Sequence, residues 1–125
     1  MSVQSEQLKE RTMIFAVAGL RLIDSLPRTP AADVVARQLV KSATSVAANY
    51  RAVCRARSRA EFVAKLCIFI EEAEGCVYWL ELILRARMLP QVTIVWARSE
   101  ADELRAIFAK SLGTARVNLR HSQIK

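Results

Sequence analysis

Histidine is nearly absent from this sequence. The single copy, His121, stands in a polar stretch near the C-terminal end of the chain, NLRHSQIK. Histidine is the side chain best suited to acid–base catalysis near neutral pH, and it is the commonest metal ligand. This scarcity argues against histidine-based catalysis and against a histidine-containing metal site. We expect a protein with no enzymatic activity, no metal and no cofactor.

Cysteine is also scarce. The three cysteines are odd in number, and no two are spaced as in the C-x-x-C motif of metal and redox sites. They stand within apolar patterns, where we expect them to act as small buried hydrophobic residues. Glutamates do cluster at residues 71–74, but no Glu-x-x-His accompanies them. This absence argues against a di-iron bundle.

Glycine and proline contribute only three residues each, whereas 53% of the chain is hydrophobic. Few turns and abundant Ala, Leu, Val, Arg and Glu favour an all-α fold. The longest stretch without a charged residue, 88–97, has ten residues, and a membrane-spanning helix needs roughly 20 apolar ones. Charged residues of both signs, at positions 6 and 9–11, precede the first apolar run, and no small-residue cleavage site follows it, unlike in a secretory signal. We therefore expect no membrane span and a cytoplasmic location.

Apolar and small residues recur at intervals of three and four in four separate runs. This spacing predicts helices at residues 4–26, 30–56, 59–87 and 92–117, followed by a fraying tail at 118–125. Thr29 and Pro30 form a helix start, and SRAE at 58–61 has the form of a capping box in which Glu61 reaches back to the N–H of Ser58. Short links predict an antiparallel up-down four-helix bundle in a single domain, residues 1–125.

Three positions within these helices raise questions of packing. Asn49 falls on the inner stripe of the second helix, where a buried amide must find hydrogen-bond partners. Gly75 interrupts the third helix, which predicts that another helix approaches closely there. Tyr78 and Trp79 are expected to pack in the core or between subunits.

Positive charge is concentrated in one part of the chain. The net charge is +7, and residues 28–59 hold seven basic residues and one acidic residue. Residues 60–84 hold five acidic residues and one basic residue. On each helix these charges fall two residues beyond core positions, which places them on the outward face. The two central helices are therefore predicted to present outward faces of opposite charge.

The basic stretch SVAANYRAVCRARSRAEF, residues 45–62, allows three interpretations. Its arginines lie on a solvated face, bind the phosphates of a nucleic acid, or meet the acidic face of another subunit. No base-reading motif is present, so any binding should depend on shape and charge. The predicted nucleic-acid-binding residues are Arg37, Lys41, Arg51, Arg55, Arg57 and Arg59, with Arg116 and Arg120 as additions.

Four stretches, in order, also carry a resemblance: DSLP, SVAANYRAVCRARSRAEF, EEAEGCVYWLELI and SLGTAR. They resemble the four helix bundle protein family, also called the 23S rRNA intervening-sequence or S23 family, over roughly residues 8–118. The resemblance is more distant to accessory proteins of diversity-generating retroelements. It implies a homopentameric ring of up-down bundles whose basic surface contacts nucleic acid, with a reverse transcriptase as a partner in the retroelement case.

Together, these observations predict a non-enzymatic, homo-oligomeric helical bundle that binds RNA or DNA mainly through phosphates. The alternative is a protein-interaction scaffold whose charged faces build a homo-oligomeric ring with no role in nucleic-acid binding.

Overall fold

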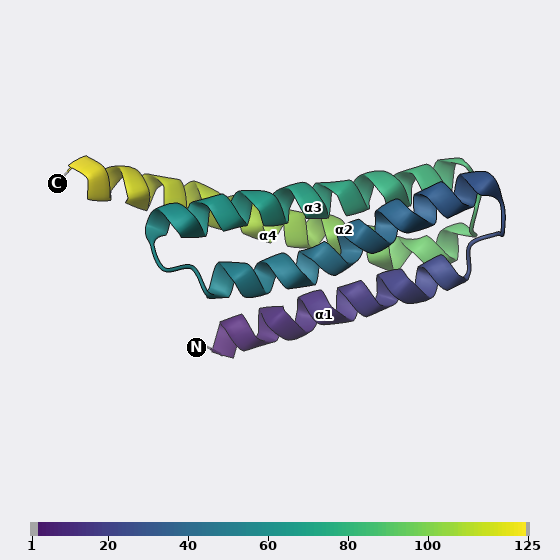
Figure 1. The fold of residues 1–125 in the computed structure, drawn as a ribbon, viewed down its shortest axis with the longest axis horizontal. Helices are drawn as coiled ribbons and strands as arrows, with labels where there is room; N and C mark the ends of the chain where they lie inside the picture. The colour runs from purple at the N-terminus through teal and green to yellow at the C-terminus, as the bar shows by residue number, and fades with distance from the viewer. Residues whose placement is uncertain (1–2, 125) are drawn as a thin grey trace.

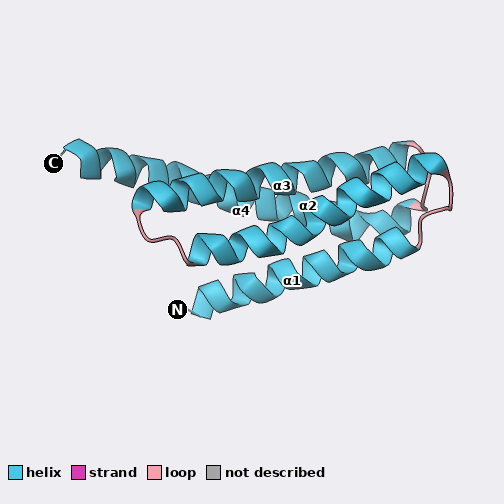
Figure 2. Cartoon of the chain, viewed as in Figure 1, coloured by secondary structure: helices cyan, strands magenta, loops and turns pink. Residues whose placement is uncertain are grey.

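The computed structural model describes residues 3–124, which form four α-helices. They are α1 (Val3–Asp24), α2 (Pro30–Cys54), α3 (Arg59–Arg85) and α4 (Gln91–Ile124). Each helix runs opposite to the one before it (Figure 1), and short loops join them (Figure 2). No strand occurs within residues 3–124. The all-α, antiparallel four-helix bundle predicted from the sequence is confirmed.

Two of the helix starts are fixed by side-chain caps. Thr29 precedes Pro30, and its hydroxyl accepts a hydrogen bond of 3.2 Å from the N–H of Ala32. The Ser58 hydroxyl accepts one of 3.0 Å from the N–H of Glu61. The other half of the predicted capping box is wrong. The Glu61 carboxylate does not bind the N–H of Ser58. It accepts a hydrogen bond of 3.4 Å from the N–H of Arg57, which lies in the link just before the helix.

The hydrophobic core draws on all four helices and follows the predicted stripes. Near one end of the bundle, three aromatic rings pack together: Phe108 lies 4.2 Å from Phe69 and 5.3 Å from Tyr50 between ring centroids. The expected burial of Asn49 is wrong, because its neighbour Tyr50 turns inward. Asn49 is half-buried and donates to the carbonyl of Ser45 at 2.8 Å, so its amide is satisfied locally.

The helices approach one another unevenly around the bundle. The pairs α1–α2, α2–α3 and α3–α4 pack along their lengths, whereas α1 and α4 touch much less. The close approach predicted at Gly75 is confirmed, since a Cβ added there would lie 3.1 Å from the Ser42 hydroxyl oxygen. At Gly19 an added Cβ would lie only 2.8 Å from the Cβ of Ala43.

The end of α4 differs from the prediction. Residues 118–124 were expected to fray, but the helix continues to Ile124 and projects beyond the α2–α3 link (Figure 1). Neither proline nor a further glycine follows Gly113 to break the helix, and the Arg59 side chain donates to the carbonyl of Asn118 at 3.3 Å. No helix within residues 3–124 is long and apolar enough to cross a membrane.

Candidate nucleic-acid interface

The arginine cluster lies where α2 ends and α3 begins. Arg55 is the residue that follows the last turn of α2, Arg57 lies in the link, and Arg59 is the first residue of α3. Arg51 precedes them by one helical turn. All four side chains are exposed. The four positive charges therefore lie around the α2–α3 link, where the chain reverses direction at one end of the bundle.

The extension of α4 brings two distant arginines to the same end. Arg116 and Arg120 are exposed, and they flank Asn118, whose carbonyl is bound by Arg59. One guanidinium nitrogen of Arg116 also lies 3.5 Å from the Cys67 sulfur on α3. We call this region the basic end, and it comprises Arg55, Arg57, Arg59, Arg116 and Arg120.

The two remaining predicted residues lie elsewhere. Arg37 and Lys41 are exposed on the outward face of α2, as their spacing predicted. Arg37 precedes Arg51 by 14 residues, which separates their backbones by about 21 Å along the helix axis. The structure therefore places Arg37 and Lys41 apart from the basic end. They share the outward face of α2 with Arg51, which lies nearer to that end.

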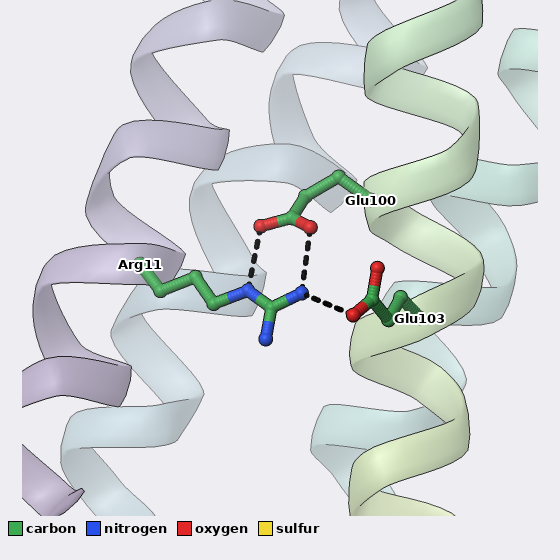
Figure 3. Close-up of polar contacts among 3 residues, drawn as sticks. All are labelled: Arg11, Glu100 and Glu103. Atoms are coloured by element: carbon green, nitrogen blue, oxygen red, sulfur yellow. Dashed lines mark hydrogen bonds and ion pairs between the residues drawn. The ribbon is translucent and has the colours of Figure 1, made fainter.

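The predicted binding residues have no carboxylate partners. Within residues 3–124, no salt bridge involves any of the eight. Arg11 shows the contrast (Figure 3): it bonds both carboxylate oxygens of Glu100 at 2.8 Å and reaches Glu103 at 3.1 Å. The pKa of Arg11 is accordingly raised, chiefly by its hydrogen bond to Glu100. The basic end keeps its guanidinium groups available for an external anion.

An open groove runs between the start of α3 and the end of α4. A hollow of about 410 Å³ is lined by Arg57, Arg59, Phe62, Ala115 and Asn118, together with Ala56 and Ser58. A second hollow of about 370 Å³ shares Phe62, Ala115 and Asn118 with the first, and adds Lys110, Ser111 and Thr114. The shared residues place the two hollows next to each other, and together we call them the α3–α4 groove.

The groove contains residues that the sequence reasoning did not assign to a site. Phe62 was placed on the inner stripe of its helix, yet it is only partly buried. Asn118 was placed in a fraying tail. One signal was available for Phe62: it stands in the first turn of its helix, directly beside the basic link, where a bundle has fewer neighbours to cover a side chain.

Other titratable groups have shifted pKa values for structural reasons. Burial raises the pKa of the Cys76 thiol to about 12. Burial, followed by the neighbouring Cys54, raises the pKa of Tyr50 to about 12. Hydrogen bonding to Arg85, and then to Arg98, lowers the pKa of Glu81. No group of three potential metal-binding side chains occurs among the described residues.

Comparison with known proteins identifies relatives of this chain. The family model described as 23S rRNA-intervening sequence protein matches residues 5–110. A crystal structure from Bacteroides thetaiotaomicron, of a protein with unknown function from the S23 ribosomal protein family, is 28% identical with a TM-score of 0.80. The alignment covers 89% of this chain and 99% of that one. No curated protein matches, and neither relative is described as an enzyme.

Proposed function

This chain belongs to the 23S rRNA-intervening sequence protein family, and we propose that it is a non-enzymatic helical bundle that binds RNA or DNA mainly through phosphates. The observation that carries the proposal is the basic end, where five exposed arginines from three segments of the chain have no carboxylate partner among the described residues.

Arginine suits this role because its planar guanidinium presents paired donors that match phosphate oxygens. Helices on both sides hold the backbone that carries the clustered charges, so little backbone order must be gained on binding. Phosphate contacts fix the position of a nucleic acid without reading its sequence. We therefore propose binding with weak sequence preference, with Arg51 and the outward face of α2 extending the contact along the bundle.

A second candidate is a scaffold that assembles into a homo-oligomeric ring without binding nucleic acid. The observation in its favour is the pair of oppositely charged outward faces, since Glu71 and Glu74 are exposed on α3 while Arg37 and Lys41 are exposed on α2. Complementary charge of this kind can fix the register between subunits. Ring assembly and phosphate binding at the basic end are compatible, because the basic end and these faces occupy different parts of the surface, whereas any contact of the nucleic acid with the outward face of α2 would compete with assembly.

The test compares two variants of equal charge. Arg55, Arg57 and Arg59 are changed to Ala in one variant, and Arg21, Arg28 and Arg87 in the other. The second set is also exposed and without salt bridges, but it lies toward the opposite end of the bundle, at the end of α1 and in the other two links. Binding of an RNA duplex and a DNA duplex is measured at several salt concentrations.

We expect the first variant to lose affinity for both duplexes and to show a shallower salt dependence. Removing one phosphate-binding arginine should reduce the slope of log K against log salt by roughly 0.7 to 0.9. The control variant should retain most of the affinity and of the slope. Equal losses in the two variants would show that only net charge matters, and unchanged binding in the first would refute the proposed interface.

A further inference from the structure

The α3–α4 groove combines apolar and cationic surfaces, and phosphate binding alone does not require the apolar part. Its centre is formed by the apolar surfaces of Phe62 and Ala115, which both hollows share. Cations stand at both ends, with Arg57 and Arg59 at one and Lys110 at the other. No acidic residue lines either hollow. A ligand that fits this arrangement has an apolar face flanked by negative charges.

Polar groups border the apolar centre and have bonding capacity to spare. The side-chain amide of Asn118 has no hydrogen-bond partner among residues 3–124, although its backbone carbonyl accepts from Arg59. The hydroxyls of Ser111 and Thr114 donate to backbone carbonyls of their own helix, at 3.2 and 3.4 Å, which leaves their oxygens free to accept. An amide and two hydroxyl oxygens can therefore meet the polar edge of a flat ligand.

We propose that the α3–α4 groove binds an unpaired nucleobase of a single strand, stacked on Phe62, with Arg57, Arg59 and Lys110 on the neighbouring phosphates. The inference rests on the proposed function and narrows it from nucleic acid in general to unpaired nucleotides. Base stacking on an aromatic ring tolerates any sequence, because every base has a π-face. The Asn118 amide offers both a donor and an acceptor to the base edge.

The position of Phe62 supports a ligand role over a purely structural one. A third hollow, of about 380 Å³, reaches the same ring from the side of α1 and is lined by Leu8, Tyr50 and Phe108. Phe62 therefore borders open space on several sides, at the end of the bundle where the basic residues gather. A single-stranded nucleotide combines the anionic, flat and partly apolar surfaces that these residues complement.

The experiment uses three RNA probes: a short oligo-uridine strand, an abasic strand of the same length, and a duplex. Wild-type protein is compared with Phe62→Leu, which keeps apolar bulk without the aromatic face. Trp96→Leu is the matched control, because Trp96 is an aromatic residue 50% exposed near the start of α4, at the other end of that helix from the groove. Thermal unfolding checks the fold of each variant. Asn118→Ala, an exposed position in the α4 extension, is the second test variant.

Wild-type protein should bind the uridine strand roughly 5- to 100-fold more tightly than the abasic strand, the range of base–aromatic stacking. Phe62→Leu should remove most of this difference and leave the affinities for the abasic strand and the duplex unchanged. Trp96→Leu should leave the difference intact, and Asn118→Ala should reduce it.

Two results would overturn the groove assignment while the phosphate interface stands. One is equal binding of the uridine and abasic strands. The other is a difference that survives both Phe62→Leu and Asn118→Ala. Failure to bind both these RNA probes and the DNA duplex would refute the proposed function itself, and the groove proposal with it.

Discussion

Gly19 and Gly113 occupy the same backbone conformation in very different surroundings, so alanine should have opposite effects at the two positions. At Gly19 the new Cβ would lie 2.8 Å from the Cβ of Ala43 across the α1–α2 contact, and the helices must separate to accept it. We expect Gly19→Ala to reduce the free energy of unfolding by about 1 to 3 kcal/mol.

At Gly113 nothing lies within 4 Å of an added Cβ. Because alanine favours a helix over glycine, we expect Gly113→Ala to increase the free energy of unfolding by about 1 kcal/mol. Urea unfolding followed by circular dichroism measures both variants. Destabilisation by both, or by neither, would contradict the assigned packing.

Single residues also mark where sequence reasoning is weakest. The repeat of three and four identified the core positions of α2, yet Asn49 and Tyr50 are adjacent and only one turns inward. The width and direction of a buried face depend on how the neighbouring helices sit, and spacing within one helix does not contain that information. The same limit applies to Glu61, whose acceptor role depends on where the link places the N–H of Arg57.

Among the helices, the loosest contact is the one between α1 and α4, and it carries the best-formed ion pair. Arg11 is held by both oxygens of Glu100, whose side chain is 11% exposed, and more peripherally by Glu103, which is 61% exposed (Figure 3). A bidentate geometry with one well-covered partner contributes more than an exposed single contact. This ion pair compensates for the limited apolar packing between the first and last helices.

We therefore expect Glu100→Gln to destabilise the bundle by about 1 kcal/mol and Glu103→Gln by no more than about 0.5 kcal/mol. Combining each change with Arg11→Gln in double-mutant cycles, by thermal unfolding, gives the two coupling energies. Coupling to Glu103 equal to or larger than coupling to Glu100 would contradict this ranking.

At the level of whole helices, the sequence located all four, and the errors are informative. The spacing of apolar residues reveals only the part of a helix that packs against its neighbours. It therefore predicted α4 only to residue 117, about as far as the bundle extends. Residues 118–122 are exposed apart from the half-buried Leu119, yet they continue the helix. This is why Asn118, and with it one wall of the α3–α4 groove, could not be predicted from the spacing of apolar residues.

For the molecule as a whole, the sequence predicted the antiparallel bundle because the links are short and each helix has one apolar stripe. It also predicted outward charged faces on the two central helices. Arg37, Lys41 and Arg51 on α2 are exposed, as are Glu71 and Glu74 on α3, whereas Glu81 of the same stripe is half-buried and pairs with Arg98 of α4. The convergence of residues 55–59 with 116–120 required the folded chain, because nearly 60 residues separate them.

Those opposite outward faces lead to a prediction about assembly, for which the family resemblance suggests five subunits. Exposed apolar side chains stand on the same two helices, with Val34 on α2, and Ile68 and Tyr78 on α3. A contact between the α2 face of one subunit and the α3 face of the next is heterologous, and such contacts form a ring when the rotation between subunits closes. We expect sedimentation to give a mass several times 14.0 kDa, with a pentamer as the expected state.

Charge reversal can identify the faces that meet. Arg37→Glu with Lys41→Glu should dissociate the ring, because like charges would then face the acidic residues of the next subunit, and Glu71→Lys with Glu74→Lys should do the same from the other side. A protein that carries all four changes restores complementarity at every interface and should reassemble. Arg21→Glu with Arg28→Glu serves as the control away from both faces and should remain assembled. A monomer of wild-type protein at micromolar concentration would contradict assembly, and a ring that survives both reversals would place the interface on other surfaces.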